Sequence, residues 1–319
     1  MAKNQETTLV TVAGIRATNK QPTEFFFNER QRIFRLADRA ADDATSLKLL
    51  RAAHRSRRPI KVSLSLRREL IERVSEPSNK ELEEFSRTRI LLENPDRVVK
   101  IDVSKIDPTL FNFVDLYQKW RCFRLCTKII PSYAKAKQIF DFCAQLSCHL
   151  PGPYTVNPCI PFQYVRDGCY ARAHQMRRII TTRYRYCCEK VFSFGYLGND
   201  QLAVRADKWG GCCVRWWYHV APLVRVRFRI RRFPKINLVL TMVIDPSMFD
   251  KPVLLSTWLS AQEHAPCAEP GRVANVSEYS IQPGSAYSPA YPPTSFSTDP
   301  NYTATQSTLI NYSGLTTCP

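Results

Sequence analysis

The first third of the chain mixes two spacings of apolar residues. Residues 7–14 are rich in β-branched side chains, and residues 59–66 alternate apolar with polar positions, so both ranges predict strands. From residue 29 to 53, apolar residues sit among charges at helical spacing, which predicts an exposed amphipathic helix or a pair of helices. The charged residues 67–89 indicate helix and loop. Few aromatic residues and no cluster of catalytic residue types occur here, so we expect a small α+β unit that packs or regulates.

The pattern after residue 130 predicts helices packed on an antiparallel sheet. A helix opens near Pro131, and its buried face carries Ala136, Ile139, Phe140 and Cys143. Prolines and a glycine make residues 150–161 a loop. Three strands are predicted, at residues 190–197, 213–224 and 236–245. The expected fold class is therefore α+β.

The composition changes from Ala265 onward to Ser, Thr, Pro, Tyr and Asn, with few charges. Such a segment is either a disordered tail or a loop-rich segment laid over the domain. Its tyrosines and Cys318 favour the second interpretation.

The formal net charge of +18 raises the question of nucleic-acid binding. The densest basic run, which begins Arg225, Arg227, Arg229, alternates at strand spacing and predicts the solvated face of a strand. No nucleic-acid fold signature is recognisable, so we expect no specific nucleic-acid partner, and attraction to acidic protein substrates explains the charge equally well.

No apolar run approaches the roughly 18 residues of a membrane helix, so no membrane partner is expected. The first residues lack the apolar core of a signal peptide. We expect either that the chain is not exported by that route or that the signal is absent from this sequence.

Twelve cysteines are present, a high number for a cytosolic chain. No C-x-x-C pair occurs, and the adjacent pairs Cys187-Cys188 and Cys212-Cys213 have poor spacing for zinc ligands. Most are therefore expected to form disulfides in an oxidising compartment. The connectivity stays open at this point.

The sequence Asp167-Gly168-Cys169 predicts a tight turn that leads directly into a helix over residues 170–180. Cys169 then lies in the first helical turn, where unpaired backbone N–H groups and the helix dipole favour an anion. A thiol there tends to ionise, and the thiolate is a nucleophile. The alternative is a buried, inert cysteine at a helix start.

His219 and Asp245 are the candidate partners of this thiol. His219 lies on a predicted strand and shares its face with Trp217, Ala221 and Leu223, where a histidine is often only a satisfied core residue. Asp245 ends the next apolar strand before a proline, and two antiparallel neighbouring strands would bring it close to His219.

His174 is the rival base. It lies about 140° round the helix from Cys169, since each residue turns by roughly 100°. Its side chain therefore points away, and we prefer His219.

A Cys at a helix start, a His on a strand and an acid on the next strand resemble a papain-like or transglutaminase-like thiol catalytic core. Further motifs are Cys159-Ile160, Asp167 to Arg177, Cys188-Glu189-Lys190, Cys212-Cys213-Val214, Tyr218 to Ala221 and Ile244 to Phe249. With these motifs the sequence resembles, more specifically, bacterial protein-glutaminase (a protein-glutamine deamidase). Carried over by position, the family's triad falls on Cys169, His219 and Asp245.

The resemblance implies a secreted bacterial enzyme that is made as an inactive precursor. Residues 1–124 resemble an inhibitory pro-region, an α+β unit over the active-site cleft, and residues 125–319 resemble the catalytic domain with a loop-rich C-terminal segment. Family positions are matched by Cys148, Cys159, Cys188, Cys212 and Cys213, whereas Cys122, Cys126, Cys143 and Cys187 are additional.

The implied reaction deamidates glutamine side chains through a Cys169 thioester, with no metal or organic cofactor. The expected partners are proteins or peptides with an exposed glutamine and an activating protease, and we expect a monomer. Candidate walls of the cleft, which would bind substrate, are Tyr164, Tyr170, Trp216 and Trp217, although each suits plain packing as well.

Two rival functions stay open. The same triad could serve a transglutaminase-like or papain-like enzyme with another acceptor or substrate. Alternatively, the chain is a basic binding protein in which the three residues do no chemistry.

Overall fold

The structure of the protein, a computed structural model, is described for residues 5–18, 21–37, 44–65, 68–93, 126–150, 158–230 and 236–318. The expected domain boundary at residue 124 lies outside these ranges. In the described ranges no helix is both long and apolar enough to cross a membrane.

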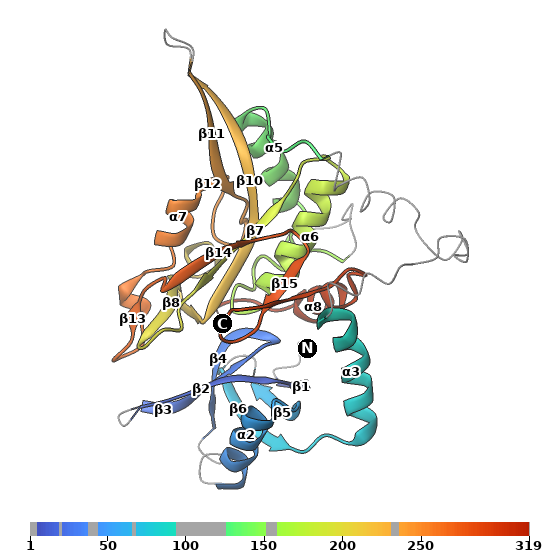
Figure 1. Cartoon of the computed structure of the whole chain (residues 1–319). Coiled ribbons are helices and arrows are strands. Elements are labelled where there is room, and N and C mark those ends of the chain that lie inside the picture. Colours follow the sequence, from blue (N-terminus) through green and yellow to red (C-terminus); the bar gives the residue numbers. More distant parts are fainter. Residues whose placement is uncertain are drawn as a thin grey trace, which may run out of the picture.

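The N-terminal unit (residues 5–93) is a six-stranded sheet with two helices. Its strand order is β1-β5-β6-β4-β3-β2. The elements are β1 (Gln5–Val10), β2 (Val12–Thr18), β3 (Gln21–Phe27), β4 (Arg30–Leu36), α2 (Ala44–Ser56), β5 (Ile60–Ser65), β6 (Leu70–Ser75) and α3 (Asn79–Glu93). In Figure 1 this blue-to-teal unit lies below the green-to-red remainder of the chain.

The helix prediction for residues 29–53 is wrong for its first part, which forms β4. Phe25 and Phe26 on β3 pair with Phe34 and Ile33 on β4, and this aromatic ladder outweighs the local charge pattern. The charged residues 67–89 likewise contain β6, which pairs with β5 over most of its length. The strand predicted at 59–66 is confirmed by β5.

The two faces of the N-terminal sheet bury side chains in different cores. Phe25 and Phe34 pack with residues of α2 in the unit's own core, whereas Phe26 and Ile33 belong to the core of the C-terminal unit. Side chains alternate between the faces of a strand, so β4 presents every second residue to the C-terminal unit. Gln31 is two residues before Ile33 on β4, so its side chain lies on the same face, toward the C-terminal unit.

The C-terminal unit (residues 126–318) is built on a five-stranded sheet of order β12-β11-β10-β7-β14, with α6 packed across β10. A three-stranded sheet of order β13-β8-β9 and the pair β15-β16 complete it. The elements up to residue 243 are α5 (Tyr133–Ala144), α6 (Cys169–Thr182), β7 (Glu189–Phe194), β8 (Asp200–Arg205), a short 3-10 helix (Asp207–Trp209), β9 (Cys213–Trp216), β10 (Tyr218–Ile230) and β11 (Ile236–Val243).

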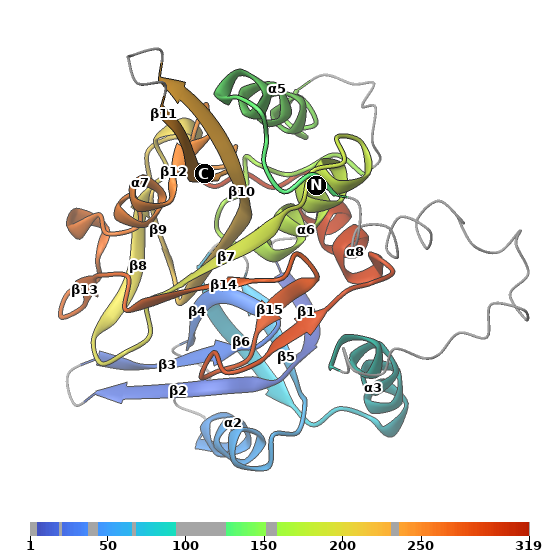
Figure 2. The same ribbon diagram turned by 45° about the horizontal axis from the view of Figure 1, so that its top comes forward.

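The last part of the chain is ordered and packs on the sheet, so the disordered-tail alternative is wrong. Its elements are β12 (Val253–Leu254), α7 (Leu255–Ser260), a 3-10 helix (Ala265–Cys267), β13 (Val273–Ala274), β14 (Glu278–Gln282), β15 (Ala286–Pro289), β16 (Phe296–Thr298) and α8 (Thr303–Tyr312). Figure 2 shows β14 and β15 crossing between β7 and the N-terminal unit. The Cys212–Cys318 disulfide ties the end of the chain to β9.

Local signals account well for the helices of this unit. Ser132 caps α5 by accepting a hydrogen bond from the N–H of Lys135 at 3.2 Å. The four predicted core residues of α5 are the four that are buried. The helix predicted at 170–180 is confirmed by α6.

On β10, Arg225 is exposed while Val226 beside it is buried, which agrees with a solvated strand face.

The predicted strand 213–224 is interrupted at Trp217. β9 pairs with β8, whereas β10 pairs with β7 and β11. The break shifts the alternation, so Trp217 does not share a face with His219, contrary to the prediction. Trp216 lies against His219 instead, with ring centroids 4.5 Å apart.

Four disulfides resolve the connectivity that the sequence left open. They are Cys126–Cys187, Cys148–Cys159, Cys212–Cys318 and Cys213–Cys267. Among the described cysteines, Cys143, Cys169 and Cys188 are free thiols, and all three are buried.

Candidate active site

Cys169 is the first residue of α6, directly after a turn that requires glycine. Gly168 has a φ of +80°, in the left-handed region, and a β-carbon there would lie 2.8 Å from the ring of Tyr312. The Asp167 carboxylate accepts the N–H of Gly168 at 2.8 Å and the hydroxyl of Tyr312 at 3.0 Å. The turn before the nucleophile candidate is therefore held by the Asp167 carboxylate and by the Tyr312 side chain.

We expect Gly168→Ala to lower the free energy of unfolding by about 1–3 kcal/mol, because the left-handed backbone and the Tyr312 ring both oppose a β-carbon. Gly198→Ala is the matched control: its φ is +52°, but nothing lies within 4 Å of the added carbon. Denaturant unfolding of the full-length variants measures both. Equal losses would show that the contact with Tyr312 is unimportant.

The Cys169 sulfur lies against the strand that carries His219. The backbone N–H of Val220 donates a hydrogen bond to it. Burial raises the pKa of the Cys169 thiol, and Asp167 and Asp245 raise it further, while Arg172 acts in the opposite direction. The raised pKa favours the protonated thiol in the full-length chain, so the expectation of a readily ionised cysteine is not met there.

His219 and Asp245 form a buried pair at the ends of neighbouring strands. Asp245 follows β11, which is antiparallel to β10, and its Oδ2 lies 2.9 Å from His219 Nε2. The indole N–H of Trp258 also donates to Oδ2 at 2.9 Å, and the hydroxyl and N–H of Ser247 donate to Oδ1. Burial alone would raise the pKa of Asp245, but the hydrogen bonds from His219, Ser247 and Trp258 outweigh it and lower that pKa to about 2.

One ring nitrogen of His219 bonds to Asp245, and the other is left to accept a proton. An ionised Asp245 can only accept, so Nε2 is the donor and Nδ1 carries the lone pair. Nδ1 is buried and has no hydrogen-bond partner in the described part of the chain. The ring is stacked between Trp216 and Trp258, at centroid distances of 4.5 and 5.4 Å, which fixes its plane.

The depressed pKa of Asp245 predicts a loss of stability in acid. The carboxyl has a pKa of about 2 when folded against an ordinary value of 3.8, so its contribution is complete above pH 4. It is lost as the pH falls from about 4 to 2, and amounts to about 2 kcal/mol. Denaturant unfolding of the wild type and of Asp245→Asn across this range should show the smaller pH dependence in the variant. Parallel pH profiles would contradict the assignment.

His174, the rival base, is held elsewhere. Its Nδ1 lies 2.7 Å from Lys190 Nζ, and its Nε2 lies 3.0 Å from the carbonyl oxygen of Asp299. Burial, with Arg177, lowers the pKa of Lys190. His174 is thus a buried structural residue, as its position on the helix indicated.

The four predicted wall residues are all buried, and three of them bond to β4. Trp217 donates its indole N–H to the carbonyl of Arg30 at 2.8 Å. The hydroxyls of Tyr170 and Tyr164 accept from Arg30 at 3.3 Å and from Arg32 at 3.1 Å. Trp216 donates to the carbonyl of Val165 at 3.1 Å. Their role in binding substrate stays a prediction.

Sequence reasoning missed Gln31, Ser247 and Trp258. Gln31 lies on β4, and its side-chain oxygen Oε1 accepts the backbone N–H of Cys169 at 3.0 Å. Ser247, two residues after Asp245, could have been found as a residue that bonds back to the carboxylate. Nothing in the sequence around Gln31 or Trp258 signals their positions. In the described ranges, no group of three or more His, Cys, Asp or Glu side chains could hold a metal ion.

Comparisons with known proteins find matches within one family. A family model described as "Glutaminase" matches residues 136–262. A mutant form of pro-protein-glutaminase has a TM-score of 0.67 at 26% sequence identity, covering 98% of this chain and 94% of that chain. Pro-protein-glutaminase has a TM-score of 0.67 at 25% identity, covering 99% of this chain and 95% of that chain. The NMR structure of protein-glutaminase from Chryseobacterium proteolyticum is 33% identical over 60% of this chain and 92% of its own, with a TM-score of 0.48. No curated protein matches. The two precursor matches extend over both units.

Proposed function

Because the chain belongs to the protein-glutaminase family, we propose that Cys169, His219 and Asp245 carry out its reaction. The reaction hydrolyses the side-chain carboxamide of glutamine in proteins and peptides to a carboxylate and releases ammonia. The chain is the precursor form, and in this proposal the N-terminal unit is the inhibitory pro-region.

The carboxamide of Gln31 is the observation that carries the proposal. A glutamine side chain lies at the start of α6, with its oxygen on the N–H of Cys169. That N–H has no partner within the helix, because it lies at the helix N-terminus, and it is the kind of donor that stabilises an oxyanion in acyl transfer. The site thus accepts the functional group on which the family acts.

In the first half of the reaction, His219 Nδ1 takes the proton of the Cys169 thiol. The thiolate attacks the carboxamide carbon, and the oxygen develops its negative charge at the Cys169 N–H. Asp245 holds the imidazole in the tautomer that leaves Nδ1 basic and stabilises the imidazolium that forms. His219 then protonates the nitrogen, which leaves as ammonia and gives a thioester.

In the second half, a water molecule replaces ammonia. His219 Nδ1 removes a proton from this water as it attacks the thioester carbon, and returns that proton to the sulfur. The product is a carboxylic acid, and the thiol is restored. Tyr164, Tyr170 and Trp217 become available to a protein substrate once β4 leaves them, and Trp216 keeps the plane of the His219 ring.

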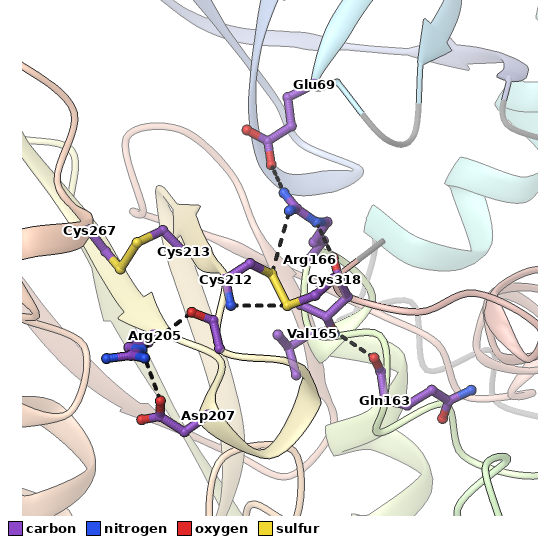
Figure 3. Close-up of a disulfide and its surroundings, with 12 residues drawn as sticks. Glu69, Gln163, Val165, Arg166, Arg205, Asp207, Cys212, Cys213, Cys267 and Cys318 are labelled. Atoms are coloured by element: carbon purple, nitrogen blue, oxygen red, sulfur yellow. Dashed lines mark hydrogen bonds and ion pairs between the residues drawn. A yellow bond between two sulfur atoms is a disulfide. The ribbon is translucent and has the colours of Figure 1, made fainter.

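Several contacts of the N-terminal unit support its role as a lid. Glu24 and Arg272 form a fully buried ion pair at 2.7 Å across the junction of the two units. Arg166, three residues before Cys169, binds Glu69 at 3.0 Å. Figure 3 shows this arginine between Glu69 and the Cys212–Cys318 disulfide. Apolar contacts of Phe26 and Ile33 add to the polar ones.

The chemical outcome on a glutamine-rich protein tests the proposal. The chain, cut between its two units, should release ammonia, and each modified glutamine should gain the mass of an –NH₂ to –OH exchange. Peptide cleavage or new crosslinks in place of ammonia would overturn it in favour of a papain-like or transglutaminase-like enzyme.

The setting of the enzyme is also a proposal. Four disulfides suit an oxidising compartment, which supports secretion, and the bacterial origin rests on the family resemblance alone. A protease that separates the two units is the implied activator. The enzyme acts as a monomer and uses no cofactor, since the proton transfers and the oxyanion are served by the chain itself.

A further inference from the structure

The hydrogen bonds that hold Gln31 in the candidate active site match the donor and the acceptor of a carboxamide. Its Oε1 accepts from Cys169 N–H at 3.0 Å, and its Nε2 donates to the carbonyls of Val165 and Arg166 at 3.2 and 3.4 Å. The residue is fully buried. One donor therefore faces the amide oxygen and two acceptors face the amide nitrogen, so the site distinguishes a carboxamide from a carboxylate.

The backbone of Gln31 is bound as an extended substrate strand would be. Its carbonyl accepts the N–H of Trp217 at 3.1 Å, and its own N–H donates to the Asp167 carboxylate at 3.4 Å. The neighbouring carbonyl, that of Arg30, accepts the indole N–H of Trp217. These bonds fix the position of the backbone from which the side chain reaches the helix start.

We propose that Gln31 is a substrate of its own chain: the precursor deamidates this residue in cis, and the carboxylate that results weakens the hold of the N-terminal unit on the active site. This inference rests on the proposed function, because it uses the same nucleophile and base. It adds a modification site and a form of regulation within the precursor.

The reaction balances with water alone. The Cys169 thiol loses its proton to His219, the sulfur bonds to the side-chain carbon of Gln31, and the C–N bond breaks as ammonia leaves with that proton. Water then cleaves the thioester, so –CONH₂ and H₂O become –COOH and NH₃. Burial of the thiol slows the attack, but the carboxamide is already bound at the N–H of the same residue, which replaces a bimolecular encounter by an intramolecular one. We therefore expect a slow, first-order conversion.

The product fits its surroundings less well than the substrate does. After deamidation, an oxygen replaces Nε2 opposite the carbonyls of Val165 and Arg166. Two hydrogen bonds are lost, and acceptors face one another in a buried place, where unpaired polar groups are costly. The Asp167 carboxylate, which accepts the N–H of residue 31, adds like-charge repulsion. Conversion of Gln31 thus favours departure of β4.

Mass spectrometry of the full-length chain tests the modification. Cleavage by chymotrypsin after Phe27 and Phe34 yields the peptide of residues 28–34, and fragment ions separate a change at Gln31 from one at Asn28. We expect Gln31 to convert with time at a rate independent of protein concentration. Cys169→Ser should leave it unconverted, and the exposed Gln138 serves as an internal control in both chains. An unconverted Gln31 in the wild-type precursor would overturn the inference.

The two proposals fail in different ways. If the chain cut between its units releases ammonia from a protein substrate while Gln31 stays intact, only the self-deamidation is wrong. If the cut chain releases no ammonia, the proposed function itself is wrong.

Substitution at position 31 tests the effect on the lid. Gln31→Glu carries the carboxylate of the deamidated product at position 31 from the start. Gln31→Met keeps the side-chain length but has neither the charge nor the hydrogen bonds. We expect the uncut Gln31→Glu chain to release ammonia from a glutamine-rich protein at least about tenfold faster than the uncut Gln31→Met chain, since only the former carries a repelled charge. Equal rates, or a slower Gln31→Glu chain, would overturn the regulatory part.

Discussion

Cys169→Ser is expected to abolish ammonia release from a protein substrate while leaving the fold intact. The hydroxyl of serine is a far weaker nucleophile than a thiolate, and in the proposed mechanism the His219–Asp245 pair serves the thiol of Cys169. Loss of the nucleophile of a triad lowers kcat by at least about 10⁴-fold. The measurement is ammonia release by the chain cut between its units, because the uncut chain buries Cys169.

Cys188→Ser is the matched control for this prediction. Cys188 is also a buried free thiol, and its sulfur donates to the carbonyl of Glu189 at 3.3 Å, a bond that a hydroxyl can replace. We expect it to keep nearly full activity. If Cys169→Ser kept its activity, Cys169 would not be the nucleophile, and a non-catalytic role for the site would have to be considered again.

Limited proteolysis near residues 120–126 is expected to raise the activity of the full-length chain sharply, by more than about tenfold. The cut lies outside the described residues, but its effect follows from contacts that are described. Once the N-terminal unit dissociates, Gln31 leaves the N–H of Cys169, and Arg30 and Arg32 leave the hydroxyls of Tyr170 and Tyr164. Burial raises the pKa of the Cys169 thiol in the full-length chain, so we expect exposure of the site to increase the ionised fraction of this thiol.

Activity should be followed together with size-exclusion chromatography, because a cut chain whose units remain associated should gain little. Cys169→Ser cut in the same way controls for ammonia released by the protease preparation. An uncut chain with the full activity of the cut one would show that the N-terminal unit is not an inhibitor.

Much of the catalytic framework could be predicted from local sequence patterns. Ser132 and Gly168 mark helix starts, alternation marks the strand that became β5, and the apolar and aromatic residues from 190 onward predicted the strand that became β7. The antiparallel pairing of apolar strands also made it reasonable to expect Asp245 near His219, and the structure places them 2.9 Å apart. These features depend mainly on spacing and on residues close in the sequence, so a local sequence pattern can predict them.

The errors arose where distant residues decide the outcome. The arginines of residues 30–36 suggested a solvated helix, but pairing with the phenylalanines of β3 made the segment a strand and buried it. Trp217 interrupts the predicted strand 213–224, since β9 and β10 pair with different partners. Because of that interruption Trp216 lies against His219, whereas Trp217 was the predicted neighbour.

The sequence by itself therefore predicted the elements of the candidate site: a cysteine at a helix start, a histidine and an acid on successive strands, and a separate unit before them. The tertiary structure decided which groups complete the site. Trp258 and Ser247 hold Asp245, and Gln31 reaches Cys169 from 138 residues away in the sequence. The bond from Gln31 depends on where the two units dock, and the docking is set by packing across their shared core rather than by any local pattern.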